Sequence, residues 1–363
     1  MTEAKTPGHG PLNGVRVVEL AGIGPGPFAA MLLADLGADV VRVDRPGGPG
    51  LGIDPALDVT NRNKRSVIVD LKDPGGPARV LDLAERADVL IEGYRPGVAE
   101  RLGVGPGDCH ARNPRLVYGR MTGWGQQGPL ADRAGHDIAY IALTGTLGMI
   151  GDPDRPPAVP ANLLGDYAGG SLYLVVGVLA ALHHARATGA GQVVDAAIVD
   201  GTAHLSAMIH GMLAAGAWQD RRGANLLDGG CPYYGTYGTA DGRHMAVGAL
   251  EPRFYAEFLS LLGLEEPAGA HTDVTRKPKL RERVAARFRS APATPGRPSS
   301  TAPTPAWRPC SPSARPRTTR ISPPAAPSPT TAASPSPHRP RGSPRPRPAS
   351  GPGPPCRAPT PRR

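Results

Sequence analysis

Three side chains in this sequence have types and settings that suit chemistry. His136 lies in Gly135-His136-Asp137, after the Gly-rich stretch 123–129, so that backbone can approach a ligand beside its imidazole. Asp166 stands at the start of a long apolar run, and Glu251 ends a shorter apolar run directly before a proline. An imidazole and two carboxylates in such places are candidates for moving protons or for attacking a substrate.

Each of the three also has a plain structural explanation. His136 fits a structural histidine whose hydrogen bonds are satisfied, and Asp166 fits the N-cap of the helix that follows it. Glu251 fits an acid at a helix start, where the helix dipole favours negative charge. None of the three is decisive by itself, so the chemistry must be argued from the elements around them.

Basic side chains gather behind several of the predicted strands. Solvated surface charge is the usual explanation for such residues. The carboxyl ends of strands in an open sheet are also where a phosphorylated ligand binds, so an anion site stays open as the alternative. The residues are Arg42, Arg45, Arg62 to Arg65, Lys72, Arg95 and Arg101.

The segment Gly22 to Pro27 follows the first predicted strand and invites interpretation as a dinucleotide-binding loop. Its two prolines remove backbone donors from the turn, and its glycines do not match the spacing of that fingerprint. We therefore do not expect a nucleotide cofactor there.

The elements that position these residues alternate between strand and helix along the first two hundred residues. This alternation predicts an α/β fold with an open, mostly parallel sheet. The expected strands are 15–20, 39–43, 89–92, 116–121 and 193–199, and the expected helices are 27–37, 77–87, 166–187 and a helix running through 213.

A smaller α+β unit is expected to begin near Asn225. Asp241-Gly242 marks a hairpin turn, and 245–247 is its returning strand. Pro252 suits the first position of a helix over 254–262, and 281–288 is expected to form another.

Composition excludes several classes of protein. The net charge is +10, but 12 of the 41 Lys and Arg residues lie in 291–363, which contains no acid; the body keeps 29 basic against 31 acidic residues. Its charge therefore suggests no nucleic-acid partner. The four cysteines show no metal-ligand or disulfide spacing. The N-terminus lacks the features of a targeting peptide, and the apolar run 172–182 is about half of the ~20 residues that cross a bilayer, so we expect a cytoplasmic protein without a membrane partner.

After Ser290 the sequence changes character, with 23 of the 44 prolines in 73 residues and no lysine or acid. Such a segment cannot build a core. A disordered linker, or an arginine tail that binds nucleic acid weakly, is one explanation, although Trp307 is its single aromatic residue for stacking. A reading-frame change is the other. Permitted codons for 292–311, read one nucleotide earlier, can give TRDAWAAVFDGTDACVAPVL, an ordinary helix-then-strand sequence.

The body of the chain resembles the α-methylacyl-CoA racemases, within the family III coenzyme A (CoA) transferases of the CaiB/BaiF superfamily. The resemblance covers about 11–290, and the alternative-frame peptide, with its Ala-Cys-Val-Ala-Pro-Val segment, resembles the family's continuation. The motifs that carry it are 14–20, 36–42, 61–66, Gly93-Tyr94-Arg95-Pro96-Gly97, Gly135-His136-Asp137 and Gly165-Asp166.

That resemblance implies a Rossmann-like large CoA-binding domain over 1–215, a linker and truncated small domain over 216–290, and a tail over 291–363. It implies an interlocked homodimer with active sites between subunits. His136 and Asp166 match the acid/base pair, and Glu251 matches a carboxylate that supports the histidine. The matched CoA contacts are Arg45, Val69, Asp70, Leu71, Lys72, Gly93, Tyr94, Arg95, Arg101, Gly135, Asp137 and Tyr140.

The chemistry implied is inversion of a 2-methylacyl-CoA thioester through an enolate, for which two proton-handling groups must flank the carbon. We expect an enolate-stabilising donor, such as a backbone N–H near Asp166. We expect no metal and no cofactor beyond the CoA of the substrate. A CoA transferase that uses Asp166 as its nucleophile is the nearest alternative, and His136 favours the racemase, since transfer gives a histidine no obvious duty.

A frame change near Ser290 would leave apolar surface of the small domain uncovered, so the chain as written is expected to fold poorly or to aggregate. Sequencing the coding DNA from about codon 270 to the stop codon tests the cause directly. We expect one nucleotide to be missing near codon 290. A confirmed frame would mean that the gene encodes a damaged relative of the family.

Overall fold

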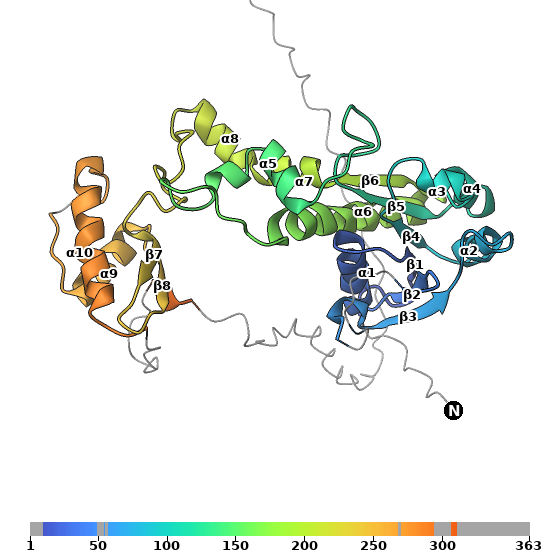
Figure 1. The fold of residues 1–363 in the computed structure, drawn as a ribbon, viewed down its shortest axis with the longest axis horizontal. Helices are drawn as coiled ribbons and strands as arrows, with labels where there is room; N and C mark the ends of the chain where they lie inside the picture. The colour runs from blue at the N-terminus through green and yellow to red at the C-terminus, as the bar shows by residue number, and fades with distance from the viewer. Residues whose placement is uncertain (1–9, 49–53, 55–56, 268–269, 294–305, 311–363) are drawn as a thin grey trace, which may run out of the picture. The chain divides into compact units, whose positions relative to one another are not determined.

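The large unit of the chain is built on a six-stranded parallel sheet (Figure 1). The computed structural model describes residues 10–48, 54, 57–267, 270–293 and 306–310. The sheet order is β3-β2-β1-β4-β5-β6, so the strand order reverses between β1 and β4. The strands are β1 (Arg16–Leu20), β2 (Asp39–Asp44), β3 (Lys64–Ile68), β4 (Val89–Glu92), β5 (Val117–Thr122) and β6 (Val193–Ala197).

Helices cover both faces of this sheet, as the continuous apolar character of β4 requires. One face packs on α1 and α6 around a core that includes Val17 and Leu174, and the other packs on α2, α3 and α4 around Val18 and Tyr118. The helices are α1 (Pro25–Asp35), α2 (Gly76–Glu85), α3 (Val98–Arg101), α4 (Pro106–Arg112), α5 (Asp137–Leu143), α6 (Leu172–Thr188), α7 (Ile198–Leu205) and α8 (Ala207–Ala214).

The edge strand β3 was not predicted, because its sequence is basic where a strand is usually apolar. Lys64 Nζ donates to Glu19 Oε2 of β1 at 2.6 Å and to the Pro27 carbonyl of α1 at 2.9 Å, and both charged side chains are buried. Arg42 of β2 lies against the same carboxylate at 4.0 Å. An internal charge cluster, rather than apolar packing, therefore attaches β3 to the sheet.

The long apolar helix is longer than expected. A π-helical segment, η3 (Leu163–Ser171), continues directly into α6, so the helix runs over Leu163–Thr188 for 26 residues and contains an 18-residue window with a mean hydropathy of 1.5. By length and composition alone it could cross a bilayer, which corrects the expectation of an apolar run half that long. Its inner face, however, contributes Leu174, Val178 and Ala181 to the sheet core, as a core helix does.

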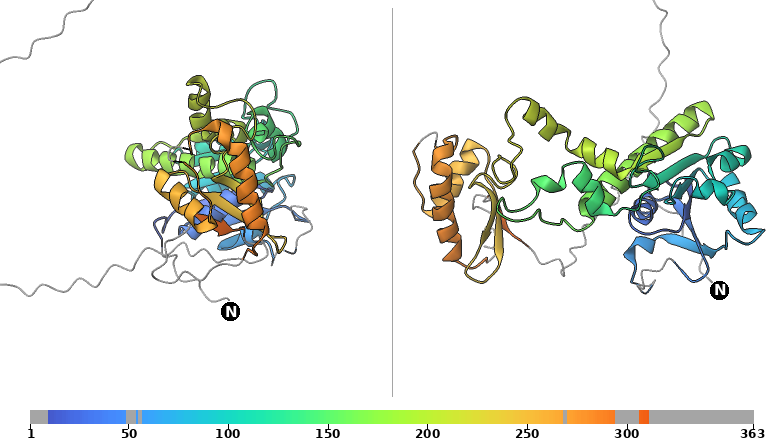
Figure 2. Two further views of the ribbon diagram at one scale, coloured as in Figure 1. Left: turned by 90° about the vertical axis from the view of Figure 1, so that its left-hand side faces the viewer. Right: turned by 45° about the horizontal axis from the view of Figure 1, so that its top comes forward.

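The small unit is an antiparallel sheet with two helices beside it, coloured gold and orange in Figure 2. Pro252 occupies the first turn of its first helix, as predicted. Cys231, Phe258 and Val284 are among its fully buried side chains. The elements of the small unit are β7 (Tyr234–Gly238), β8 (His244–Gly248), α9 (Pro252–Leu262), α10 (Lys277–Arg289) and β9 (Trp307–Pro309). Elsewhere the described residues form short 3-10 turns at η1 (Val59–Asn61) and η2 (Leu147–Met149), and η4 (Val274–Arg276) precedes α10.

Strand β9 comes from the segment that the sequence assigned to the low-complexity tail. It pairs antiparallel with β8, and the Trp307 ring lies 5.7 Å from Phe258 and 6.3 Å from Phe288. Most of the remaining tail, 294–305 and 311–363, lies outside the described residues. The three residues of β9 thus belong with the small unit, and the domain boundaries near 215 and 290 stay predictions.

Replacing Trp307 by Ala in the full chain tests this strand. We expect the free energy of unfolding of the small unit to fall by roughly 2 kcal/mol, less than for a fully buried tryptophan, because the ring is half-buried. Trp307→Phe, which keeps an aromatic ring against the same neighbours, should lose much less. Chemical denaturation followed by circular dichroism measures both, and an unchanged midpoint for Trp307→Ala would contradict the pairing.

Candidate active site

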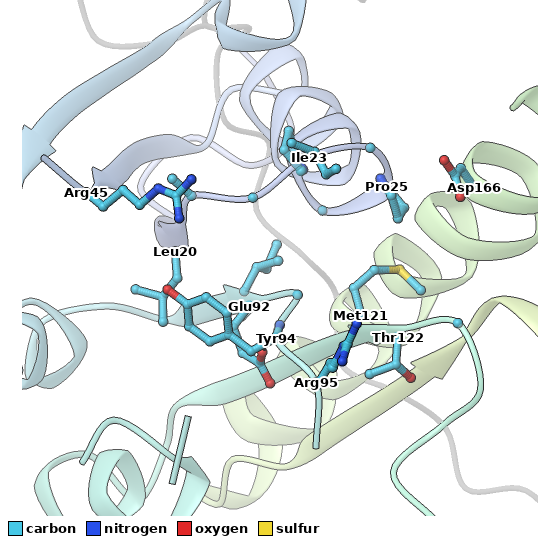
Figure 3. A pocket seen from close by; sticks show the side chains of 18 of the residues that line it. Leu20, Ile23, Pro25, Arg45, Glu92, Tyr94, Arg95, Met121, Thr122 and Asp166 are labelled. Carbon is cyan, nitrogen blue, oxygen red and sulfur yellow. The ribbon is translucent and has the colours of Figure 1, made fainter. Parts of the chain in front are cut away.

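A cavity of about 1120 Å³ opens at the carboxyl ends of β1, β4 and β5, beside the reversal in strand order. In Figure 3, Asp166 lies next to Pro25 on one side of the cavity and Arg45 projects from the other. Twelve of the residues that the sequence predicted for the site line it: Arg45, Val69, Asp70, Leu71, Lys72, Gly93, Tyr94, Arg95, Gly135, His136, Tyr140 and Asp166.

Asp166 lies inside the π-helix η3 and is not the N-cap of the helix, a position that Asn162 holds. The Asn162 side chain donates to Asp166 Oδ2 at 3.2 Å. Gly24, at the start of α1, has φ +70°, and a Cβ on it would lie 3.2 Å from the same oxygen. The carboxylate therefore faces the cavity between the α1 loop and Asn162, and the local π-helical turn, a feature often found at functional sites, sets its direction.

Burial raises the pKa of Asp166 above the ordinary range of an aspartate. The hydrogen bond from Asn162 lowers it, the nearby Asp137 carboxylate raises it, and the charge of His136 lowers it. Desolvation is the largest of these effects, so burial outweighs the interactions that favour the ionised carboxylate.

His136 is the N-cap of α5 and is exposed at the rim of the cavity. Its carbonyl accepts the Ala139 amide at 2.8 Å, which fixes the backbone. Within the part of the chain that the structure describes, its ring makes no hydrogen bond, so it is not a satisfied structural histidine. It is electrostatically coupled to Asp166, and the two line the same cavity.

Asp137, the residue after His136, contacts the backbone of Asp166, and its expected contact with CoA stays a prediction. Asp137 was expected to contact CoA, but it does not line the cavity: it is 6% exposed, and its Oδ2 accepts the Asp166 backbone N–H at 2.7 Å. The N–H of Asp166 itself is therefore engaged by a carboxylate, and the expected enolate donor, a backbone N–H near Asp166, stays a prediction.

The basic residues separate into two groups. Arg45, Lys72 and Arg95 line the cavity, whereas Arg62 pairs with Asp35 and Arg65 pairs with Asp39. Arg42 and Lys64 form ion pairs with the buried Glu19 carboxylate. Arg101, also expected to contact CoA, does not line the cavity. Three of the predicted basic residues thus lie at the cavity, where an anion site is supported, and those with carboxylate partners do not line it.

A second buried charge cluster shapes the loop that carries Tyr94 and Arg95. Glu92, at the end of β4, accepts the Tyr94 amide at 2.6 Å and the Arg120 Nε at 2.9 Å. Arg120 also donates to Glu100 of α3 at 2.8 Å. Burial raises the pKa of Glu92. Sequence reasoning missed this cluster, because a glutamate and an arginine on different apolar strands give no local signal.

Other lining residues were missed although a signal existed. The loop Gly22 to Pro27, set aside as a nucleotide loop, forms one wall of the cavity, and its position after β1 at the edge of an α/β sheet was the available clue. Trp124, Arg133 and Tyr167 also line the cavity, and their neighbourhood to His136 or Asp166 in sequence pointed to them.

Glu251 is the N-cap of α9 in the small unit, and its carbonyl accepts the Tyr255 amide at 2.9 Å. It is exposed and is not among the residues that line the cavity. Its expected role in supporting His136 stays a prediction.

Comparison with known proteins agrees with this geometry. The model of "CoA-transferase family III" matches residues 12–295. Human alpha-methylacyl-CoA racemase is 50% identical over 256 residues, which cover 70% of this chain and 65% of the human protein. Succinyl-CoA–D-citramalate CoA-transferase of Chloroflexus aurantiacus is 36% identical, covering 71% of this chain and 66% of that enzyme. A CAIB/BAIF family protein from Brucella suis superposes with a TM-score of 0.66 at 30% identity, covering 78% and 79% of the two chains.

The raised pKa of Asp166 predicts a pH-dependent contribution to stability. A folded state that binds this proton more tightly than the unfolded chain is favoured at low pH, and the advantage is lost as pH rises through the folded pKa. Asp166→Asn removes the ionisation, so its melting temperature should rise relative to the wild type as pH increases from about 4 to 7.5. Thermal unfolding measures this. Asp132→Asn, at an exposed loop carboxylate, is the control, and a pH-independent difference for Asp166→Asn would contradict the prediction.

Proposed function

The chain belongs to CoA-transferase family III, and on that basis we propose that it is a racemase that interconverts (2R)- and (2S)-2-methylacyl-CoA thioesters. The observation that carries the proposal is the placement of His136 and Asp166 in one cavity that Arg45, Lys72 and Arg95 also line. The 50% identity to the human racemase supports it, although the chain spans about two thirds of that enzyme's length.

The reaction needs two proton-handling groups. One takes the α-proton, and the C–H electron pair moves into the carbonyl to give a thioester enolate. The other delivers a proton to the opposite face of the α-carbon, and the electrons return to re-form the carbonyl. One group must therefore be protonated while its counterpart is not. The raised pKa of Asp166 favours its holding that proton, and His136 is then the base; the reverse assignment serves the other enantiomer.

The remaining cations account for the CoA part of the substrate. Arg45, Lys72 and Arg95 offer positive charge for its phosphate groups. The buried contacts of Glu92 with Arg120 and with the Tyr94 amide fix the loop that presents Arg95. The proposed chemistry uses no metal and no redox cofactor.

A homodimer completes the proposed site. Exposed apolar side chains lie on the elements around His136: Ile138 and Leu143 of α5, Leu163 of η3 and Met208 of α8. Apolar exposure of this kind suggests a partner surface. In an interlocked dimer, Glu251 of the partner subunit would support the His136 imidazole, which explains why Glu251 is absent from the cavity of its own chain.

We also propose that the enzyme acts in the cytoplasm, in fatty acid metabolism.

The alternative function is CoA transfer, with Asp166 as the nucleophile that carries the acyl group. Relatives such as the citramalate CoA-transferase keep this open. His136 favours the racemase. Its ring has no hydrogen-bond partner among the described residues, and it lines the same cavity as Asp166, where racemisation needs a second proton carrier. Transfer alone would not require it.

The C-terminal part bears on whether the chain as written is active. The family match ends at residue 295, a few residues beyond the predicted frame change at Ser290. In the alternative-frame peptide, Val-Ala-Pro falls at positions 307–309, where Trp307–Pro309 forms β9. The restored frame would therefore place a valine where Trp307 stands in β9.

Deuterium exchange tests the function. The full chain and the frame-restored chain are incubated with (2S)-2-methyldecanoyl-CoA in D₂O, without an acceptor acid. From the frame-restored chain we expect deuterium at the α-carbon together with formation of the (2R) epimer, and from the chain as written we expect little or none. His136→Ala and Asp166→Ala in the restored chain should lower the activity by at least about 100-fold, as for loss of a general acid or base. In a parallel incubation with an added carboxylic acid, CoA transfer to that acid without α-exchange would favour the alternative.

A further inference from the structure

Asp137 connects the two side chains to which proton transfer is assigned. It follows His136 directly in the chain, and its carboxylate reaches the backbone of Asp166, 29 residues away. We propose that Asp137 is a positioning residue that holds the Asp166 backbone against the start of α5, beside His136, and whose negative charge opposes ionisation of Asp166. The inference rests on the proposed function, but its geometry does not.

The contact between Asp137 and the π-helix is unusually close. Asp137 Oδ2 accepts the Asp166 N–H at 2.7 Å, and a Cβ on Gly165 would lie 2.6 Å from the same oxygen. A side chain at residue 165 would therefore push the carboxylate away. Because Asp137 is 6% exposed and α5 packs on η3, the anchor fixes where the Asp166 turn sits relative to the N-cap His136.

The second carboxylate oxygen of Asp137 indicates that its charge does more than anchor the Asp166 amide. Asp137 Oδ1 is buried and has no hydrogen-bond partner among the described residues. A neutral acceptor such as asparagine would anchor the Asp166 amide without leaving a buried charge, which is costly when it is unpaired. The retained charge therefore has an effect that anchoring alone does not require, and its nearest acidic neighbour at the cavity is Asp166.

The charges around Asp166 support this assignment. Asp137 raises its pKa and His136 lowers it, while Tyr140 of α5 is the further titratable group that interacts with it. Among the other packed elements, α7 carries Asp200 and His204, α6 carries His183, His184 and Arg186, and α1 carries Asp35 at its far end. None of these six is among the groups that shift the pKa of Asp166.

The effect on chemistry follows from like charges. With Asp137 ionised, a second negative charge on Asp166 is opposed, so Asp166 tends to keep its proton; a protonated His136 has the opposite influence. Asp137 thus helps Asp166 to hold the proton that racemisation requires on one member of the pair.

A mutant cycle in the full chain tests the proposal without requiring activity. Melting temperatures of wild type, Asp137→Asn, Asp166→Asn and the double variant are compared from about pH 4 to 7.5. Asn keeps an acceptor for the Asp166 amide but removes the charge. We expect the effect of Asp137→Asn to become more favourable as pH rises in the wild-type background and to be flat with pH in the Asp166→Asn background. An equal effect at every pH in both backgrounds would overturn the proposal, leaving Asp137 as a structural acceptor only.

Two further measurements keep the test decisive. Gly165→Ala disturbs the same contact while keeping both carboxylates, and should show the same pH trend even if Asp137→Asn fails to fold; Asp132→Asn should show none. In the deuterium assay, Asp137→Asn should move the acid limb of kcat/KM to lower pH by about half a unit or more. Absence of exchange in the wild-type and frame-restored chains would reject the racemase function, whereas exchange with an unmoved acid limb would reject the role of Asp137.

Discussion

The reversal of strand order between β1 and β4 is the constraint on which the site depends. Strands β1, β2 and β3 extend to one side and β4, β5 and β6 to the other, so the loops after β1 and β4 lead away from each other and leave a crevice at their carboxyl ends. The cavity occupies that crevice, with the Gly22 to Pro27 loop on one wall and the Gly93 to Pro96 loop on another. Fold and site thus have one geometric origin.

Buried charge holds the parts of this crevice in place. Lys64 joins the edge strand to β1 and to the first turn of α1, and Glu92 joins Arg120 to the loop after β4. The Asp137 carboxylate joins α5 to the π-helix. In each case a charged group inside the protein links two segments that are distant in sequence. Removing one partner would leave the other charge buried and unpaired, so these positions are sensitive to substitution.

The small unit shows that a proline-rich segment can still supply a strand to a sheet. The segment around Trp307 is rich in proline and follows an abrupt change of composition, yet it supplies a strand to the open edge of β8. An exposed edge offers unpaired backbone groups to any extended segment within reach. The aromatic contacts of Trp307 with Phe258 and Phe288 then add apolar burial that the sequence pattern gave no reason to expect.

The sequence by itself determined the α/β alternation, most strands of the large sheet, the hairpin of the small unit and the residue types for proton transfer, because periodicity and turn residues are local properties. It missed β3, whose charged side chains are compensated only by Glu19 and Asp39 on other strands. Only the tertiary structure decided that Asp166 lies within a π-helix, that Asp137 holds its amide, and which basic residues face the cavity. Those outcomes depend on contacts between residues that are distant in the sequence, and a local sequence pattern does not identify which residues will be in contact.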